Sequence, residues 1–565
     1  MEKPDQLLES SRKLSSSEMD DGSKTERSIS PPFEQIPVKS EKSIKNTETS
    51  AAEEWVYLTG FKLWAVIGVV TVACFILLLD TAIIATAIPK ITSDFHSLND
   101  VGWYGSSYLL ASAALTPMAG KIYTRYNSKW SFLSFLGVFE LGSLLCALAK
   151  DAKMLIVARA IAGLGSSGLI NGALTIIANS IPLEKRAAST GFLMAFAQMG
   201  LLLGPVIGGA LTQHVSWRWC FWINLPAGAL TAAILLLIQI PQRIAVRTKK
   251  STWQSFIMEL DIPGFFLFAP TTIMLLLALQ WGGTKYAWSS ATIIGLFCGF
   301  AANTVVFCIW EKSRGEMAMI PWSMIKQRVV WCSCLLMLFF FGANLIISYY
   351  LAIYFQAVKG VSPTTSGVNF LPSILSQMFM AITSGVLVGK LGYYLPWAVI
   401  SSVFSSLGHG LISTFTPTTT TGVWIGYQII GGAGRGAGLQ MPIIAIQNCI
   451  PQEQVSIGMS LVAFAQTLGG SLFLAFAQTC FSGALPKSLA THAPGVSHTL
   501  VEQAGASGFR EVIPKESLAG VIEAYNDSLN QVFYIAAAAS AACFIFAWGM
   551  GWKDIRKKKI VEVAA

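Results

Sequence analysis

Four ionisable side chains interrupt long apolar stretches of this 565-residue chain: Asp80, Glu140, Arg159 and Arg435. A carboxyl group in apolar surroundings can bind and release a proton, and a neighbouring guanidinium favours its charged form. Inside a membrane such charges are costly unless they are paired or hydrated, and they mark proton, ion or substrate pathways. The four residues therefore predict the movement of protons or solutes, provided that the stretches around them cross a membrane.

The amino-acid composition indicates that they do. Hydrophobic residues make up 53% of the chain and charged residues only 12%, whereas soluble domains carry about 25% charged residues. Uninterrupted apolar runs of about 20 residues recur, which is the length that a helix needs to cross the bilayer and more than a barrel strand needs. Since only helices and closed barrels satisfy their backbone groups in lipid, we expect an all-α polytopic membrane protein.

The net charge of +9 and the ten cysteines fit this fold class. Most Lys and Arg residues lie in short links between apolar runs, where the positive-inside rule places them, so nucleic-acid binding is not expected. The cysteines are scattered and lack the spacing of a metal site. We therefore expect no metal and no cofactor, and we expect the thiols to be small buried groups.

Fourteen apolar runs follow a polar N-terminal segment. The runs lie near residues 62–89, 102–120, 131–149, 153–181, 188–212, 222–241, 261–282, 290–310, 330–357, 364–389, 395–414, 421–447, 455–484 and 531–552. Residues 1–58, rich in Ser, Lys and Glu, cannot bury enough apolar surface to fold alone and are expected to be a disordered tail. Cations concentrate in the links after even-numbered runs, which places both termini, with the basic tail 553–565, in the cytoplasm. The long link 485–530 is then external, and its sequon at Asn526 lies so near the membrane that we expect no glycan there.

Two pairs of short segments show that the chain repeats itself. Gly120–Asn127, after the second run, matches Gly385–Gly392, after the tenth, and Arg159–Gly165 in the fourth run matches Gln428–Gly434 in the twelfth. We therefore expect two parallel six-helix halves separated by two inserted helices, at residues 59–241, 329–552 and 242–328 respectively. Repeated halves around a central site are a transporter architecture.

The motifs also have the order and spacing of a known family. They resemble those of the major facilitator superfamily, in particular its fourteen-span drug:proton antiporter branch and the fungal efflux pumps within it. The matching segments are Leu79–Pro89, Gly120–Lys129, Arg159–Gly165, Gly200–Gly209, Trp217–Gly228 and Tyr349–Gln356, and the resemblance covers nearly everything after residue 60. It implies a major facilitator fold with 14 transmembrane helices, acting as a monomer. It also implies proton-coupled export of drugs, toxins or fungal secondary metabolites by alternating access at the plasma membrane.

One position departs from the family pattern. The loop between the second and third runs usually carries an acid where this chain has Thr124. The loop can still position Gly120, Arg125 and Lys129, but a charge relay through an acid is not expected there. More of the proton coupling therefore falls on the acids inside the apolar runs.

Asp80 and Arg159 are the first candidates for that coupling. Asp80 lies nine residues before Pro89, and Arg159 lies a few residues into a run that enters from the outside, so both belong to the outer half of the bilayer. Glu140, midway along the third run, either titrates as well or makes a structural hydrogen bond to a neighbouring helix. Arg435, near the middle of its run, either faces the substrate cavity or pairs with one of the two acids, because an unpaired cation at that depth is costly.

Glycines and neutral polar side chains complete the expected site. Gly200, Gly204, Gly208 and Gly209 give the fifth run a small-residue stripe that lets another helix approach closely, and Pro205 permits a bend. A cavity with aromatic surface and few hydrogen bonds suits amphipathic molecules. The cavity candidates besides Arg435 are Gln198, Gln440, Trp103 and Tyr108.

Several other functions remain open or are disfavoured. A siderophore importer and a vacuolar amino-acid carrier share the fold, and a vacuolar membrane is an alternative location. A non-transporting membrane sensor usually has a long signalling domain, and a membrane enzyme needs a catalytic cluster that the sequence lacks. No ATP site is expected, because Gly385–Lys390 is one residue short of a phosphate loop and Leu391 stands where Ser or Thr is required.

Overall fold

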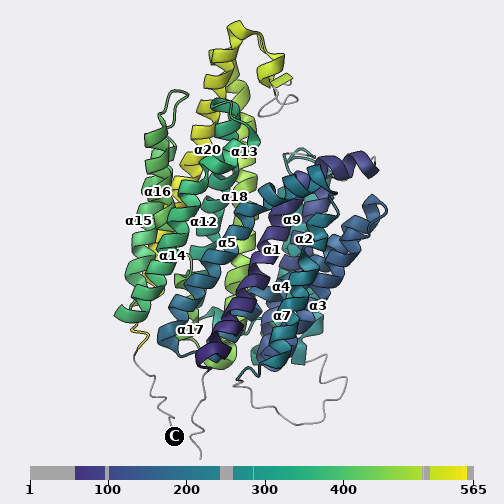
Figure 1. Cartoon of the computed structure of the whole chain (residues 1–565), viewed down its shortest axis with the longest axis vertical. Coiled ribbons are helices and arrows are strands. Elements are labelled where there is room, and N and C mark those ends of the chain that lie inside the picture. The colour runs from purple at the N-terminus through teal and green to yellow at the C-terminus, as the bar shows by residue number, and fades with distance from the viewer. Residues whose placement is uncertain are drawn as a thin grey trace, which may run out of the picture. The chain divides into compact units, whose positions relative to one another are not determined.

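The fourteen apolar runs form helices in the computed structural model of the chain (Figure 1), which describes residues 58–95, 101–241, 259–283, 285–498, 500–501 and 509–556. The predictions for the N-terminal tail and for the last residues of the basic tail concern positions outside these ranges. Besides helices and turns, the described ranges contain two isolated β-bridges, Gly282 with Tyr286 and Tyr393 with Asp554.

The first six runs correspond to seven helices. They are α1 (Gly60–Phe95), α2 (Val101–Arg125), α3 (Ser128–Ala147), α4 (Ala152–Ser180), α5 (Leu183–His214), and the consecutive α6 (Trp219–Trp222) and α7 (Asn224–Leu237). The two inserted runs are α9 (Ile262–Trp281) and α10 (Ala291–Arg314), followed by the short η2 (Gly315–Met317) and α11 (Trp322–Ile325).

The last six runs have a similar order with more breaks. They are α12 (Arg328–Ile353) continued by the π-helical η3 (Tyr354–Val358), α13 (Pro363–Asn369) with α14 (Leu371–Leu391), α15 (Leu395–Ile412), α16 (Thr421–Gly438) with α17 (Met441–Cys449), the short η4 (Gln452–Gln454), α18 (Val455–His492) and α20 (Lys515–Gly549). Thirteen helical segments of the described chain are long and apolar enough to cross a membrane. α2 has the length, with 25 residues, but Ser, Thr and Tyr residues make it less apolar. The predicted all-α polytopic fold is confirmed.

Polar side chains in the links determine where some of these helices begin. At the start of α3, the side chain of Asn127 accepts hydrogen bonds from the backbone N–H groups of Lys129 and Trp130. At the start of α4, the Asp151 carboxylate accepts one from the N–H of Met154. Such caps satisfy N–H groups that have no partner within the helix. Asn127 and Asp151 in the short links therefore set where α3 and α4 begin.

The helix packing repeats between the two halves. α1 packs on α5, α2 on α4 and α3 on α4; in the second half α12 packs on α18, α14 on α16 and α15 on α16. The contacts of α7 with α1 and α3 have their counterparts in those of α20 with α12 and α15. This correspondence supports the proposed duplication, in which α1 to α7 match α12 to α20.

The two halves meet through one pair of equivalent crossings, α5 with α14 and α2 with α18. In the first crossing, a Cβ at Gly191 would lie 2.7 Å from the carbonyl oxygen of Ala381, and a Cβ at Gly385 would lie 2.7 Å from that of Ala187. In the second crossing, a Cβ at Gly120 would collide with α18. The helices approach so closely because glycines remove the side chains between them. Both crossings lie toward the ends of the helices at which the α2–α3 and α4–α5 links are found.

The inserted helices are attached to the first half by a buried polar network. The Asp261 carboxylate, at the start of α9, accepts hydrogen bonds from Trp310 Nε1 of α10 and from the backbone N–H of Met319, both at 2.8 Å. Lys121 Nζ of α2 donates to the carbonyl oxygen of Met317 at 2.5 Å. The segment that follows α10 is thereby fixed against the end of α2.

The lipid-facing side of α10 corrects one expectation about the cysteines. Cys298 and Cys308 are exposed rather than buried, because α10 packs mainly on α9 and leaves most of its surface uncovered. On a membrane-spanning helix this apolar surface can face lipid, so an apolar run does not imply burial within the protein.

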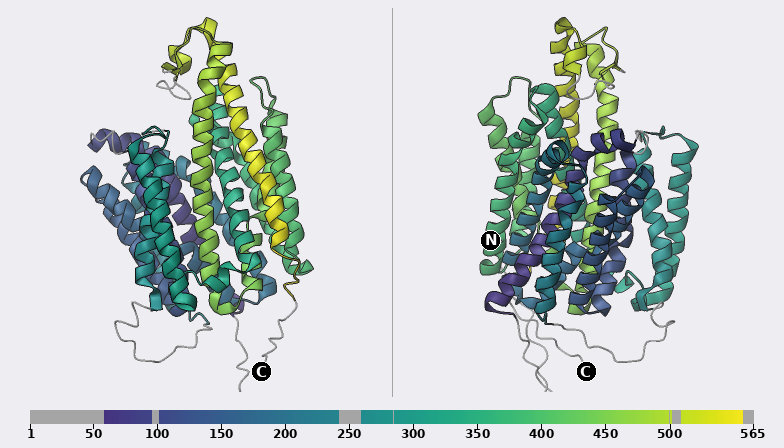
Figure 2. Two further views of the ribbon diagram at one scale, coloured as in Figure 1. Left: turned by 180° about the vertical axis from the view of Figure 1, so that it is seen from behind. Right: turned by 45° about the vertical axis from the view of Figure 1, so that its right-hand side comes forward.

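The prediction of an external loop over residues 485–530 needs correction. α18 continues to His492 and α20 begins at Lys515, and in Figures 1 and 2 the two helices run side by side past the ends of their neighbours. Leu489 of α18 and Tyr525 of α20 are buried in one apolar cluster with Phe509 from the connection between the helices. Hydropathy marks where apolar sequence ends, whereas these helices continue because their facing sides still bury apolar surface.

Two cationic side chains make backbone contacts at the end of η3, and one of them comes from this extension. Arg510 donates to the carbonyl oxygens of Ala357 and Val358 at the end of η3, and Lys359 Nζ donates to those of Pro417 and Thr419. Partial burial lowers the pKa of both Arg510 and Lys359, since it disfavours their charged forms. The Arg510 contacts satisfy carbonyl groups at the C-terminal end of η3, and the Lys359 contacts join this end to the link between α15 and α16.

The Asn526 sequon lies inside α20. The side chain is buried, and its Nδ2 donates to the carbonyl oxygen of Phe415 at 2.9 Å. The amide that a glycan would modify is therefore already engaged in the fold. This packing, rather than nearness to the membrane, is the structural reason to expect an unmodified Asn526.

Candidate functional site

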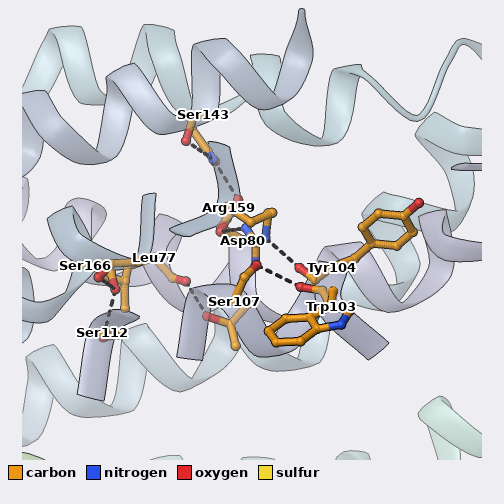
Figure 3. Close-up of polar contacts among 12 residues, drawn as sticks. Leu77, Asp80, Trp103, Tyr104, Ser107, Ser112, Ser143, Arg159 and Ser166 are labelled. Carbon is orange, nitrogen blue, oxygen red and sulfur yellow. Dashed lines mark hydrogen bonds and ion pairs between the residues drawn. The ribbon is translucent and has the colours of Figure 1, made fainter. Parts of the chain in front are cut away.

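Asp80 and Arg159 form a buried ion pair in the first half. Arg159 Nη1 of α4 donates to Asp80 Oδ2 of α1 at 2.6 Å, and both residues are about 1% exposed. Figure 3 shows the two side chains pointing toward each other, with Tyr104 beside the guanidinium. Arg159 Nε donates to the Tyr104 carbonyl oxygen of α2 at 3.1 Å. The two residues, expected only to share a depth in the membrane, therefore form a pair that links three helices.

Asn224 completes the hydrogen bonds of the carboxylate. Its Nδ2, at the beginning of α7, lies 3.1 Å from Asp80 Oδ1 and 3.1 Å from Ser143 Oγ of α3. The same amide group thus connects the charged pair to α3. Asn224 lies within the Trp217–Gly228 motif but was not among the predicted site residues; the available signal was a polar amide in an otherwise apolar segment.

Aromatic rings cover the other side of the guanidinium. The Cζ atom of Arg159 lies 4.3 Å from the centre of the Tyr108 ring and 5.9 Å from that of Phe221. A cation over an aromatic face is stabilised by the ring quadrupole, most strongly where water is excluded. Tyr108, expected in the substrate cavity, lies against the ion pair in this structure.

Glu140 lies close to this pair on α3 and remains without a partner. Both of its carboxylate oxygens are buried, and neither has a hydrogen-bond partner among the described residues. Its carboxyl group packs against Gly228 of α7, where any Cβ would collide with it. Gly228 is one helical turn beyond Asn224, so the same face of α7 contacts Glu140 and Asp80. The structure therefore shows no ion pair between Glu140 and Arg435, one of the alternatives that the sequence left open.

The glycine stripe of α5 packs directly on the helix that carries Asp80. A Cβ at Gly200 would lie 2.7 Å from the backbone nitrogen of Leu79, and one at Gly208 would lie 2.7 Å from the carbonyl oxygen of Ile83. Gly204 packs on the intervening turn of α1. Gly209 has nothing within 4 Å of its Cβ position, so it lies outside the stripe. α5 also continues through Pro205 as a helix.

The Gly120–Lys129 motif, which covers the end of α2 and the start of α3, contacts both the second half and α7. Gly120 packs against Ser456 and Ser460 of α18. Lys129 Nζ donates to the carbonyl oxygens of Leu236 and Ile238 at the end of α7, each at 2.9 Å. Arg125 is exposed. This motif therefore takes part in the contact between the halves through Gly120 and binds the end of α7 through Lys129.

The remaining cavity candidates do not converge on one site. The Trp103 ring contacts that of Trp281 on α9 edge to face, with centroids 5.7 Å apart. Gln440 is fully buried at the α5–α14 crossing, where its Nε2 donates to Ala381 O and Ser384 Oγ. Gln198 is half-buried. Gln440 thus helps hold the crossing in this structure, and a contact with substrate remains a prediction for it and for the others.

Arg435 is buried in the second half, away from the acids of the first. Its guanidinium donates to Asn344 Oδ1 of α12 at 2.7 Å and to Ser373 Oγ of α14. Neither acceptor was identified from the sequence, although an amide inside the apolar run of α12 was a visible signal. In the described part of the chain, no set of His, Cys, Asp or Glu residues is arranged to hold a metal ion.

Comparison with known proteins identifies the family. The model of the Major Facilitator Superfamily matches residues 70–474. The chain is 54% identical over 500 residues to the MFS-type transporter pigP of Monascus ruber, covering 88% of each chain. It is 51% identical over 537 residues to the efflux pump mlcE of Penicillium citrinum, covering 94% of this chain and 97% of the relative.

A solved structure supports the fold independently. The structure of the proton:xylose symporter XylE, bound to 6-bromo-6-deoxy-D-glucose, superimposes with a TM-score of 0.55 over 87% of this chain and 97% of that chain. The sequence identity is 14%, so this similarity concerns the fold alone. The resemblance noted in the sequence to fungal efflux-type transporters is confirmed, and the chain belongs to the Major Facilitator Superfamily.

Proposed function

We propose that this chain is a proton-coupled exporter of hydrophobic or amphipathic small molecules that works by alternating access between its two halves. The observation that carries the proposal is the buried Asp80–Arg159 pair, which combines a titratable acid with a fixed cation inside a membrane-spanning bundle. The names of the relatives, an efflux pump and an MFS-type transporter, support export over siderophore import or amino-acid carriage.

Protonation of Asp80 changes the contacts of three helices at once. The charged carboxylate accepts hydrogen bonds from Arg159 and Asn224; the neutral acid no longer balances the guanidinium. α1 then loses its ionic contact with α4, while the glycine stripe keeps it packed on α5. Because α5 also forms the crossing with α14, a movement of α1 with α5 is transmitted to the contact between the halves. This is the physical link between proton binding and the direction in which the site opens.

Glu140 is the proposed second proton site. A carboxylate without hydrogen-bond partners is costly to bury in its charged form, and both oxygens of Glu140 are in that position. Because one face of α7 contacts both acids, a proton on either one changes the environment of the other. Asp80 loses its ion pair with Arg159 when it binds a proton, and Glu140 binds a second proton close by.

We place the exporter in the plasma membrane with both termini in the cytoplasm. In this orientation the α5–α14 and α2–α18 crossings face the cytoplasm, so the structure represents the state closed on that side. Substrate loading then requires that these glycine crossings separate. Gly120, Gly191 and Gly385 are the positions at which that separation begins.

The experiment is efflux from cells that express the full chain, with a panel of fluorescent amphipathic compounds. Cells with the transporter should accumulate less of at least one compound than cells without it, and a protonophore should remove the difference. Inside-out vesicles should take up the same compound when their lumen is acidified. Equal accumulation of every compound with and without the chain would refute export, and efflux that is unaffected by the protonophore would refute proton coupling.

A further inference from the structure

Arg435 places an unbalanced positive charge inside the second half. It lies fourteen residues after Thr421 and fourteen before Cys449, the ends of the apolar segment that contains it, and it is 2% exposed. The groups that accept its hydrogen bonds, Asn344 Oδ1 and Ser373 Oγ, are neutral. Among the described residues, no carboxylate forms an ion pair with Arg435.

In the first half, by contrast, the charge of the buried arginine is neutralised by an ion pair. There Arg159 of α4 is paired with Asp80 of α1. By the repeat, α16 and α12 are the corresponding helices, and they carry Arg435 and Asn344. The arginines occupy different positions along their helices, but the helix pair is the same. Asparagine has the shape of aspartate without its charge, so the second half holds its guanidinium by hydrogen bonds and leaves the charge uncompensated.

The guanidinium also has unused hydrogen-bonding capacity. Arg435 Nε is buried and has no hydrogen-bond partner among the described residues, whereas a guanidinium has five N–H donors in a planar fork. The Phe370 ring, 6.0 Å from the Cζ atom, provides an apolar surface beside it. His409, a titratable neighbour that interacts electrostatically with Arg435, is a base and supplies no negative charge. An uncompensated cation at this depth is costly, and a ligand with one carboxylate and an apolar body would satisfy both the charge and the free donor.

We propose that Arg435 binds the carboxylate of the transported molecule, which makes amphipathic organic acids the substrate class of this exporter. The inference rests on the proposed function, because it names what the export site accepts. Ser373 belongs to α14, the helix that crosses α5 of the other half. Separation of α5 from α14 therefore moves one wall of the Arg435 site and gives the acid access from the end proposed to be cytoplasmic.

Binding to the purified full chain in detergent tests the proposal without a proton gradient. The probes are 1-pyrenebutyric acid and its methyl ester, which share an apolar body and differ in the charged group. Energy transfer from tryptophan to pyrene reports the affinity of each. The wild type should bind the acid tighter than the ester by on the order of tenfold or more, since hydrogen bonds to a charged partner are about twice as strong as neutral ones.

Asn344→Asp is the decisive variant. It adds a carboxylate where Asn344 Oδ1 already contacts Arg435, so it should neutralise the guanidinium from within and reduce the preference for the acid to below about twofold. Ester binding should stay near the wild-type value, which shows that the fold is intact. Asn344→Ser is the matched control, because it changes the same contact without adding charge and should keep the preference. Arg435→Gln should lose the preference for the acid over the ester.

The outcomes separate this inference from the proposed function. Equal affinity of the wild type for acid and ester, binding of neither probe, or a preference that survives in Asn344→Asp would overturn the anion site. Each of these results leaves proton-driven export of neutral compounds untouched. Conversely, a transporter that shows no gradient-driven export but selects the acid through Arg435 would retain the anion site and lose the proposed function.

Discussion

Replacing Asp80 by Asn removes one charge from the buried pair and almost nothing else. The amide has nearly the size of the carboxylate, so packing of α1 against the α5 glycine stripe is kept. Arg159 then lacks a counterion while it retains its bond to the Tyr104 carbonyl group at 3.1 Å and the Tyr108 ring at 4.3 Å. The variant therefore imitates a permanently protonated acid.

The energetic consequence follows from these contacts. Removing one partner of a buried ion pair costs about 3–5 kcal/mol when nothing compensates. The cation–π contact with Tyr108, about 1–2 kcal/mol in a desolvated setting, remains in place. We therefore expect the Asp80→Asn protein to fold with a lower unfolding temperature and to lose the energetic difference between its proton-free and proton-loaded forms.

Transport in proteoliposomes distinguishes coupling from stability. A pH gradient should drive substrate accumulation in the wild type and should no longer drive it in Asp80→Asn. Exchange of labelled for unlabelled substrate, which needs no net proton movement, should stay within about threefold of wild type. Asp94→Asn is the matched control: Asp94 lies on the same helix, near its exposed end, where it accepts from Trp217 Nε1 at 2.9 Å, and its loss should leave the gradient dependence intact.

A double variant tests whether charge is the cause. Arg159→Gln alone leaves Asp80 buried without its cation and should destabilise the protein, whereas Asp80→Asn with Arg159→Gln removes both charges. The double variant should unfold at a higher temperature than either single variant, because a neutral pair avoids the uncompensated charge. Full gradient-driven accumulation by Asp80→Asn would refute the coupling role, and additive stability losses in the double variant would refute the ion pair as their cause.

Three further predictions concern packing and modification. Gly204→Val should lower the free energy of unfolding by about 1–3 kcal/mol, because its Cβ would lie 2.5 Å from the Ala82 Cβ, while Gly209→Ala should be nearly neutral; equal thermal unfolding of both variants in detergent would contradict the α1–α5 contact. Gly385→Val should force open the crossing with α5, so that in inside-out vesicles a membrane-impermeant thiol reagent labels a cysteine introduced at Ala187, the residue that faces Gly385, faster than without the valine; unchanged labelling would exclude that crossing as the closed end. Asn526 should carry no glycan, so endoglycosidase treatment of the secretory-pathway protein should leave its mobility equal to that of Asn526→Gln; a shift in the wild type would contradict the buried amide.

The sequence predicted the helices well because the bilayer limits what a chain can do. A run of about 20 apolar residues has few alternatives to a spanning helix, and the order of runs fixes the order of helices. The shared depth of Asp80 and Arg159 was predicted for a similar reason, because depth along two helices can be counted in residues; their direct ion pair was not predicted. The extension of α18 to His492 was missed because lipid does not impose it, and it depends on apolar contacts such as those of Leu489.

The face that each helix turns toward its neighbours or toward a cavity was much harder to predict. Gln440 and Tyr108 were both assigned to a substrate cavity from their polarity and aromatic character. In the structure Gln440 is enclosed at the α5–α14 crossing, and Tyr108 covers Arg159. Which side of a helix faces a cavity depends on tertiary packing, and a helix that is apolar all round gives no periodic signal of it. The same limitation concealed Asn224, whose partner lies 144 residues away in the chain.

The two halves share their helix packing but differ in what their buried arginine contacts, and under the two proposals this difference gives each half its own role. In the first half the partner of Arg159 is a carboxylate, which a proton can neutralise, so the charge of that half changes with proton binding. In the second half Arg435 faces the amide of Asn344, which does not titrate, so its charge is constant until an anion arrives. A duplicated pair of helices can thus serve as a proton switch on one side and as an anion receptor on the other. Among the differences between the two sites, the one that decides whether the arginine is neutralised is carboxylate against amide, Asp80 against Asn344, which is why Asp80→Asn and Asn344→Asp are informative substitutions in this chain.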